Sequence, residues 1–235
     1  MARTVNAAAH AQRRDEFLDA AQRMVDTKGF EAMSVQDVLT EAGASKGAFY
    51  HYFGSKQDLL EALADRMSAA ITSRLAPVVD DADLAAVAKL RRFFADLGEW
   101  KTERRDLLAG ILRVWYSDGN AVVRVKVRAT ITDRIAPLLA RIVAQGVAEG
   151  DLTLAHPERA GRVLVALIQD LNDELAALLL RGEDGPAGLA AACETVAAST
   201  EAVERILGVP PGSVVLVDRG VLRTWYGSEP EGSLT

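Results

Sequence analysis

The pattern of apolar and polar positions in the first third of the chain predicts a series of short and medium helices. Between residues 17 and 25 the apolar side chains recur at the spacing of an amphipathic helix, which Gly29 closes. Ser34, followed three residues later by Asp37, is typical of a helix N-cap, and the helix that it starts ends at Gly43. Two more helices are predicted. The first runs from Ser45 to near Gly54, and the second opens at Ser55 and ends at Pro77 and the acidic stretch over residues 80–83.

The rest of the chain continues the helical pattern. Five further helices are predicted, over residues 84–101, 104–117, 120–145, 157–181 and 187–207. Three glycines are expected to stop helices here, namely Gly146, Gly182 and Gly208. The tail over residues 209–235 is expected to pack on the domain and to contain a short helix from Asp218 to Trp225. The pattern predicts an all-α fold of about nine helices.

Composition supports this fold class. Hydrophobic residues make up 49% of the chain and aromatic residues only 6%, a balance that favours helices over a β-sandwich or barrel. The longest uncharged run, Ile206–Val217, falls short of the roughly 18 residues that a membrane span needs, so no membrane partner is expected. The first residues lack a signal peptide, and the single Cys193 cannot form an internal disulfide. A cytoplasmic location is therefore expected.

The charge of the chain is distributed unevenly. The formal net charge is −6, and residues 1–75 hold 9 Lys and Arg against 10 Asp and Glu. A protein that coats nucleic acid would be basic overall, so a DNA-binding function requires local placement of basic groups. We expect a flexible basic arm over residues 1–12, a DNA-binding domain over 13–60, a larger helical domain over 61–208 and the tail over 209–235.

Residues 34–56 have the spacing of a helix-turn-helix. Two short helices are joined by a tight turn at Gly43, which can adopt the left-handed conformation that a sharp helix exit needs. In such a motif the second helix enters the major groove of DNA. The start of that helix offers small or polar groups to the groove, from Ser45, Lys46, Gly47 and Ala48.

Polar groups at the end of the motif can hold phosphates. Tyr50 and His51 can donate to phosphate oxygens, and Lys56 adds a charge at the start of the next helix. Phe49 and Phe53 in the same stretch are expected to be core aromatics. Outside this motif, the two lysines would be ordinary solvated side chains.

Residues 13–62 resemble the DNA-binding domain of the TetR family of bacterial transcriptional regulators. The resemblance rests on the Ser34–Val38 helix, the Ala42–Gly47 turn and the Phe49–Leu60 stretch, and it covers about 50 of the 235 residues. Two positions depart from the family pattern, with Leu39 where Ala is usual and Ala44 where Val is common. The C-terminal part resembles the family only in length, helicity and order of elements.

The resemblance implies roles for individual residues in binding double-stranded DNA. Two are expected to approach the DNA backbone, Ser34 and Val35. Three are expected to face base edges, Gln36, Lys46 and Ala48. Phosphates are expected to be held by Tyr50, His51 and Lys56.

A homodimer is expected because one short recognition helix contacts too few base pairs for specific binding. A two-fold dimer presents two such helices about 34–36 Å apart and matches a palindromic operator. The resemblance places the interface on the helices near 157–181 and 187–207. The first carries a leucine-rich face and the second is rich in alanine. The alternative is that these faces only complete an internal core.

A repressor also needs an effector that releases it, and a helical domain of this size can enclose a small, largely apolar ligand. Candidate lining residues combine bulk with hydrogen-bonding capacity or lie on the same helix face, and they are Trp100, Leu112, Trp115, Tyr116, Gln169 and Asn172. Trp115 could equally be an ordinary core tryptophan. Gln169 and Asn172 could instead face solvent beside their acidic neighbours.

Other classes of function are less well supported by the sequence. His10, His51 and His156 are far apart and show no metal-ligand or catalytic spacing, so no enzyme activity, metal or cofactor is expected. A nonspecific architectural DNA binder should be basic overall. An activator, or a regulator controlled by a partner protein, would have the same sequence features as a ligand-released repressor.

Overall fold

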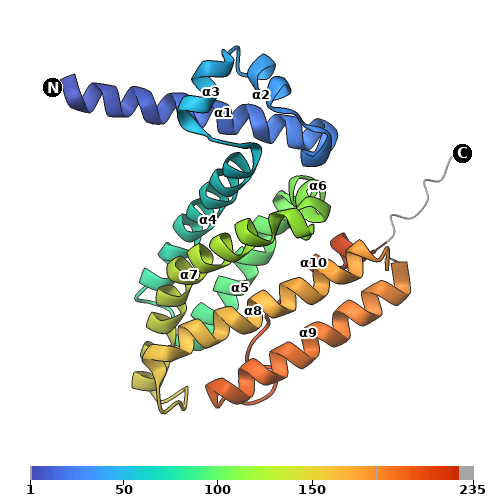
Figure 1. The fold of residues 1–235 in the computed structure, drawn as a ribbon. Coiled ribbons are helices and arrows are strands. Elements are labelled where there is room, and N and C mark those ends of the chain that lie inside the picture. Colours follow the sequence, from blue (N-terminus) through green and yellow to red (C-terminus); the bar gives the residue numbers. More distant parts are fainter. Residues whose placement is uncertain (1, 184, 228–235) are drawn as a thin grey trace, which may run out of the picture. The chain divides into compact units, whose positions relative to one another are not determined.

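The computed structural model describes residues 2–183 and 185–227, and throughout these residues the regular structure is helical, which confirms the all-α prediction (Figure 1). In chain order the elements are α1 (Ala2–Ala32), α2 (Val35–Glu41), α3 (Lys46–Tyr52), α4 (Lys56–Asp80), α5 (Ala86–Glu103), α6 (Arg105–Trp115), η1 (Asp118–Asn120), α7 (Ala121–Glu149), α8 (Pro157–Leu180), α9 (Gly185–Leu207) and α10 (Arg219–Tyr226). Within the described ranges, no helix combines the length and apolar character that a membrane span requires.

The chain divides into two compact units. The first contains residues 2–67 and 106–127, and the second contains residues 68–105 and 128–227. The division predicted from the sequence assigns the whole of 61–208 to the second part, whereas the structure adds α6 and the start of α7 to the first unit. Gly110 helps to explain this difference, because a Cβ there would lie 3.6 Å from the carbonyl oxygen of Val25 on α1. The glycine lets α6 approach α1 closely.

The N-terminal segment corrects one expectation from the sequence. Residues 2–12, for which the composition predicts a flexible arm, continue α1 as helix. The segment is rich in alanine, which has the highest helix propensity, although it lacks the apolar periodicity of a packed helix. The predicted break at Gly29 is confirmed, since this residue has φ +76° and ψ 155° inside the range of α1.

The core of the first unit fixes α1, α2, α3 and the start of α4 to one another. Arg66 of α4 donates to Asp19 Oδ1 at 2.6 Å and to Gln22 Oε1 at 2.8 Å, both on α1. Leu39, which departs from the family pattern, packs into the core with 3% exposure. Other buried members of this core are Phe17, Leu18, Val25, Phe30, Met33, Val38, Phe49, Phe53, Leu59 and Leu60.

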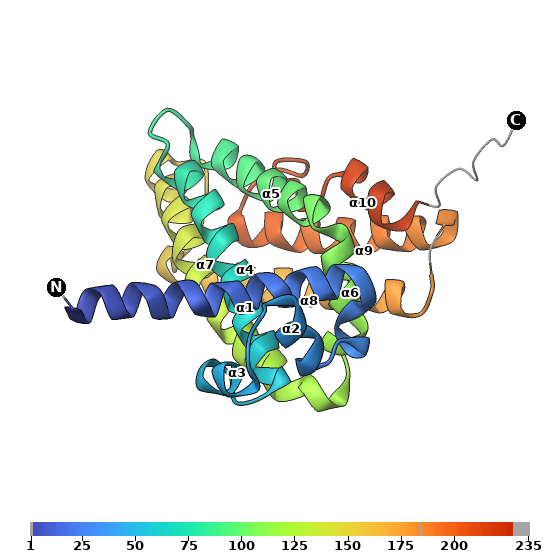
Figure 2. The same ribbon diagram turned by 90° about the horizontal axis from the view of Figure 1, so that it is seen from above.

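In the second unit, α8 and α9 lie side by side and α10 packs against both α9 and α5 (Figure 2). Gly161 of α8 lies so close to α7 that a Cβ there would be 2.0 Å from the carbonyl oxygen of Ala136. Residues 209–227 of the tail pack on this unit, as expected: buried Glu204 accepts a 2.9 Å hydrogen bond from the backbone N–H of Val214. The rest of the predicted tail, 228–235, lies outside the described residues. The predicted short helix near the C-terminus is confirmed as α10.

One predicted helix end is wrong, because α7 continues through Gly146 to Glu149. The helix that opens near Ser55 ends at Asp80, within the predicted acidic stretch, and Pro77 lies inside its last turn. A Cβ at Gly146 would lie 2.5 Å from the side chain of Leu152, so this glycine serves close packing within the helix. The left-handed conformation after α7 is adopted by Gly150 instead, with φ +84°.

Candidate nucleic-acid interface

The start of α2 is fixed by a capping box. The backbone N–H of Asp37 donates to Ser34 Oγ at 3.1 Å, and the backbone N–H of Ser34 donates to Asp37 Oδ2 at 2.7 Å. Lys28 of α1 forms an ion pair with Asp37 Oδ1 at 2.7 Å. The hydrogen bond from Lys28, followed by those from Ser34, holds the pKa of Asp37 well below its usual range. These contacts orient the first helix of the motif, with Gln36 exposed and Val35 partly exposed.

The turn between α2 and α3 has the conformation that the sequence predicts. Gly43 has φ +57°, and the backbone N–H of Ala44 donates to the carbonyl oxygen of Leu39 at 2.9 Å. Ser45 then caps α3, since its Oγ accepts a 3.2 Å hydrogen bond from the backbone N–H of Ala48. A Cβ at Gly47 would meet nothing within 4 Å, so packing inside the protein does not require this glycine. Its bare backbone leaves room for close approach from outside.

The inner face of α3 is held by aromatic rings. Phe49 has 0% exposure, and its ring centroid lies 5.8 Å from that of Phe17 and 5.5 Å from that of Phe53. Phe53 is also buried, so the expectation that these two phenylalanines are core residues is confirmed. Because the inner face is fixed in this way, the opposite face of α3 is presented outward in one orientation.

The outward face of α3 is polar and accessible. Lys46 and His51 are exposed, and the Tyr50 side chain is 50% exposed. The Lys46 ammonium lies 6.0 Å from the centroid of the Tyr50 ring. These groups offer an ammonium, a phenol and an imidazole on the same helix as the bare backbone of Gly47.

His10 joins this face, although no sequence pattern selects it. Its ring centroid lies 5.6 Å from that of His51 and 4.5 Å from that of Tyr52. The contact depends on the helical extension of α1, which replaces the expected flexible arm. A histidine in a polar, Ala-rich segment carries no spacing signal that could have identified this contact.

The Lys56 side chain is held against the protein and does not extend freely into solvent. Its ammonium lies 4.5 Å from the centroid of the Phe30 ring and donates to the carbonyl oxygen of Glu31 at 3.2 Å. Burial lowers its pKa, against the opposing charges of Glu31 and Asp37. An ammonium has three N–H donors, so this arrangement orients Lys56 without using all of its hydrogen-bonding capacity.

The six candidate effector residues are divided between the two units. Leu112, Trp115 and Tyr116 lie on α6 or directly after it in the first unit, where the Arg124 guanidinium lies 5.5 Å from the centroid of the Tyr116 ring. In the second unit Trp100 is buried, with 7% exposure, beneath the guanidinium of Arg104.

The remaining two candidates, on α8, make contacts between helices of the second unit. Gln169 donates to the carbonyl oxygen of Arg128 at 3.1 Å and to Thr132 Oγ1 at 3.2 Å. Asn172 Oδ1 accepts a 2.7 Å hydrogen bond from Lys101 Nζ. The alternative that these amides only face solvent therefore does not describe their position.

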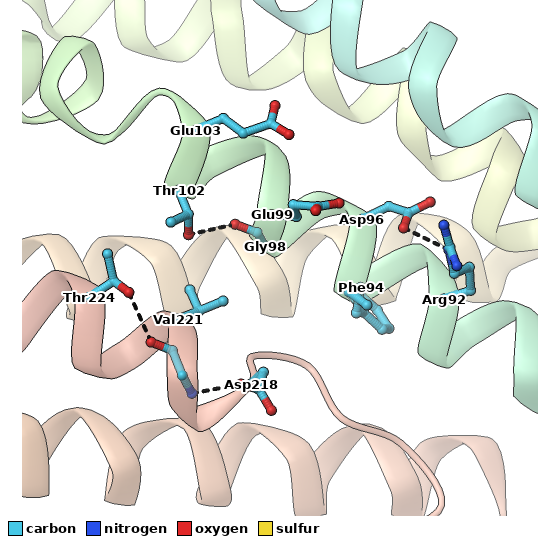
Figure 3. Close-up of a pocket in the computed structure, with 12 residues that line it drawn as sticks. Arg92, Phe94, Asp96, Gly98, Glu99, Thr102, Glu103, Asp218, Val221 and Thr224 are labelled. Carbon is cyan, nitrogen blue, oxygen red and sulfur yellow. Dashed lines mark hydrogen bonds and ion pairs between the residues drawn. The ribbon is translucent and has the colours of Figure 1, made fainter.

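A groove of about 670 Å³ lies between α5 and α10 in the second unit (Figure 3). Phe94, Gly98 and Val221 supply apolar surface, and acidic side chains are prominent along its α5 side. Asp96 in this lining is paired with Arg92 at 2.7 Å, and Figure 3 shows the pair at one end of the groove. None of the six candidate effector residues is among the described residues that line this groove.

No group of three or more His, Cys, Asp or Glu residues suited to a metal ion occurs in the described part of the chain. What the first unit does contain is a capped helix, a glycine turn and a second capped helix with an exposed polar face. This geometry defines the class of helix-turn-helix DNA-binding proteins.

The comparisons with known proteins agree with this class. Residues 17–63 match the model of the bacterial regulatory proteins of the tetR family. The HTH-type transcriptional repressor KstR2 of Mycolicibacterium smegmatis is 41% identical over 51 residues, which are 22% of this chain and 25% of that protein. The HTH-type transcriptional repressor AcnR of Corynebacterium glutamicum is 27% identical over 127 residues, covering 52% of this chain and 65% of the relative. The chain thus spans between a quarter and two thirds of the length of these relatives.

Solved structures share the fold over most of the chain. A TetR-family transcriptional regulator from Pectobacterium atrosepticum superposes with a TM-score of 0.62 at 20% identity, over 86% of this chain and 98% of that one. A TetR transcription regulator from Haloarcula marismortui gives 0.61 at 18% identity, over 84% and 97%. Residues 17–63 are thus similar to the DNA-binding domain of the TetR family of bacterial regulatory proteins, and the solved structures share the fold of the rest of the chain.

Proposed function

We propose that this protein is a transcriptional repressor that binds a palindromic operator as a homodimer and is released by a small molecule. The observation that carries the proposal is the geometry of α3: its inner face is fixed by Phe49 and its outer face is polar and exposed. A rigid helix with such a face suits the major groove. The family model of the tetR regulators matches residues 17–63, which contain this helix, and two relatives of the chain, KstR2 and AcnR, are named as repressors.

The residues of the motif divide by role. The base edges would be contacted by Gln36, Lys46 and Ala48, and the open backbone of Gly47 would allow the close approach that these contacts need. The hydroxyl of Ser45 would also face the groove. The proposed contacts to the sugar-phosphate backbone come from Ser34, Val35, Tyr50, His51 and Lys56.

The proposed dimer forms through α8 and α9. These helices lie side by side in one chain and leave apolar or small residues exposed, including Val163 with 46% exposure on α8 and Ala190 and Ala197 on α9. Small residues let helices from two subunits approach closely, and a two-fold axis there would generate a four-helix bundle. The same axis would pair two recognition helices on one palindrome.

Release by an effector would follow from its difference in affinity for two dimer shapes. The second unit supplies polar groups between helices at Gln169 and Asn172, and the aromatic surface of Trp100 lies on α5 of the same unit. Together they would suit a small, largely apolar ligand with few polar atoms.

Selection of bound sequences from a random DNA pool tests the proposal. The purified protein should enrich one palindrome with half-sites about 10 base pairs apart, centre to centre. A folded, dimeric protein that enriches no sequence and carries no co-purified small molecule would contradict it. The enriched sequence then serves as the probe for variants.

Three variants separate the proposed roles on that probe. Lys46→Ala should relax sequence preference at one position of each half-site, because it removes a base contact. Lys56→Ala should weaken binding to all sequences and reduce the magnitude of the salt slope by about 0.9 for each phosphate that is no longer neutralised. Arg141→Ala removes the same charge from an exposed position of α7 in the second unit and should leave both properties unchanged. Equal losses of affinity on specific and random DNA for Lys46→Ala would exclude its role at a base.

A further inference from the structure

Lys101 is a cation of the second unit whose hydrogen-bonding capacity is mostly unused. It lies in the last turn of α5, is partly exposed as a residue, and donates through Nζ to Asn172 Oδ1 of α8 at 2.7 Å. Among the described residues, this neutral amide is its one hydrogen-bond partner. An ammonium has three N–H donors, so two of them are left for another acceptor.

The acidic residue next to Asn172 is already engaged with a different cation. Asp173 pairs with Arg128 of α7, and Gln169 donates to the carbonyl oxygen of the same arginine. Burial lowers the pKa of Lys101 to about 8, and no acidic neighbour offsets that effect. Lys101 is therefore still charged near neutral pH, in surroundings that lack a compensating carboxylate within the described contacts.

Lys89, a buried lysine of the same unit, has contacts that are typical of a structural role. Lys89 has 4% exposure, and its ammonium donates to the carbonyl oxygen of Val79 in the last turn of α4 at 2.7 Å. A cation at a helix C-terminus stabilises the last carbonyl groups and the helix dipole, so Lys89 holds α4 and α5 together. Hydrogen bonds from the backbone N–H of Ala86 and from Gln145 lower the pKa of Glu149, and the charge of Lys89 adds to this effect. Lys101 has neither kind of contact, and a buried charge paired only with an amide opposes folding.

We propose that the effector of this regulator carries a carboxylate, and that Lys101 binds it together with Asn172 between α5 and α8. The proposal rests on the function proposed above, because it names the chemistry of the releasing molecule. Since Asn172 uses its Oδ1 to accept from Lys101, its amide nitrogen keeps two donors that can reach the same anion. A carboxylate accepts from both groups and neutralises the ammonium, which strengthens each hydrogen bond.

The body of the ligand is expected to be apolar. Trp100, next to Lys101, is buried with 7% exposure, and Leu171, next to Asn172, is buried with 3% exposure. The core beside these two helix turns is therefore apolar, and polar atoms of a ligand that enters it would have few partners. The partial exposure of Lys101 provides a route by which the anion reaches the ammonium.

The test compares acids with their neutral amides on the full-length dimer. The probes are straight-chain and phenyl-substituted carboxylic acids of about four to fourteen carbons, a size range that fits small-molecule sites. Each acid is paired with its own primary amide. Two quantities are measured, the ligand-dependent shift in melting temperature and the release of the selected operator.

The proposal expects an acid that stabilises the protein and releases operator while its amide does neither. In Lys101→Met the acid concentration for half-maximal release should rise by at least about tenfold, because a charge-assisted hydrogen bond is removed. Lys126→Met, which removes an exposed lysine of the first unit, should respond like the unmodified protein. An acid and amide of equal effect, an unchanged response in Lys101→Met, or no response to any acid would overturn the proposal.

Measuring operator binding in the absence of any acid separates a failure of the carboxylate inference from a failure of the proposed function. Lys101→Met should bind the operator with the affinity of the unmodified protein, since Lys101 lies outside the helix-turn-helix unit. If both bind the operator and neither responds to acids, only the carboxylate inference fails. If neither binds any sequence, the regulator itself is contradicted.

Discussion

Replacing Lys101 with methionine is expected to stabilise the protein at neutral pH. Burial lowers the pKa of Lys101 from its ordinary 10.5 to about 8. Each pKa unit is worth about 1.4 kcal/mol, so burial opposes the charged form by about 3 kcal/mol. Partial exposure of the residue reduces this figure, and the variant leaves Asn172 without its donor at a cost of about 1 kcal/mol. We expect Lys101→Met to raise the free energy of unfolding at pH 7 by about 1 kcal/mol.

The stability difference between Lys101→Met and the unmodified protein should change with pH in a direction that can be checked. Between pH 8 and 10.5 the unfolded chain retains a proton on Lys101 that the folded chain has released. Stability therefore rises with pH through this window in the unmodified protein, because the unfolded state binds more protons. Lys101→Met lacks this contribution. Its advantage should be present below pH 8 and shrink as the pH approaches 10.5.

Urea unfolding followed by far-UV circular dichroism measures the effect. Both proteins are unfolded at pH 7, 9 and 10.5 at one protein concentration, because the proposed dimer would make the stability depend on concentration. Subtracting the free energies of unfolding of the two proteins at each pH cancels the contributions of all the titratable groups that they share. A difference that stays constant across these pH values, or a variant less stable at pH 7, would refute the argument that burial of the charged amine is uncompensated.

Three further substitutions test the fold. Ser34→Ala removes the cap of α2 and should lower the free energy of unfolding by about 1 kcal/mol, measured by urea unfolding; no change would mean that the capping box contributes nothing. Gly161→Ala forces a Cβ to within 2.0 Å of the Ala136 carbonyl oxygen and should cost at least about 2 kcal/mol, whereas the exposed Ala166→Ser on the same helix should change little. Glu204→Leu leaves the buried N–H of Val214 without its acceptor and should cost about 2 kcal/mol and expose the tail to proteolysis, and an uncleaved tail would contradict this.

The motif could be predicted because its interactions are local in sequence. Ser34 and Asp37 cap each other within one turn, and Gly43 alone determines the sharp exit from α2. Glycine by itself is a less reliable signal. Gly208 ends α9 with φ +69°, as expected, whereas Gly146 continues α7 because its missing side chain accommodates Leu152. A glycine required by backbone conformation and one required by packing look identical in a sequence, and only the tertiary neighbours distinguish them.

The candidate effector site in the second unit is less predictable for the same physical reason. Asn172 could be selected because it interrupts an apolar helix, but its partner Lys101 lies 71 residues away. On sequence alone, Lys101 is an ordinary solvated lysine in the last turn of a helix. What distinguishes Lys101 is the free-energy cost of burying its charged ammonium without a carboxylate partner. This cost arises only when α5 and α8 pack together. Folding does not require that charge, so a ligand that binds and neutralises it would stabilise the folded protein, and the shift in melting temperature proposed above would detect this stabilisation.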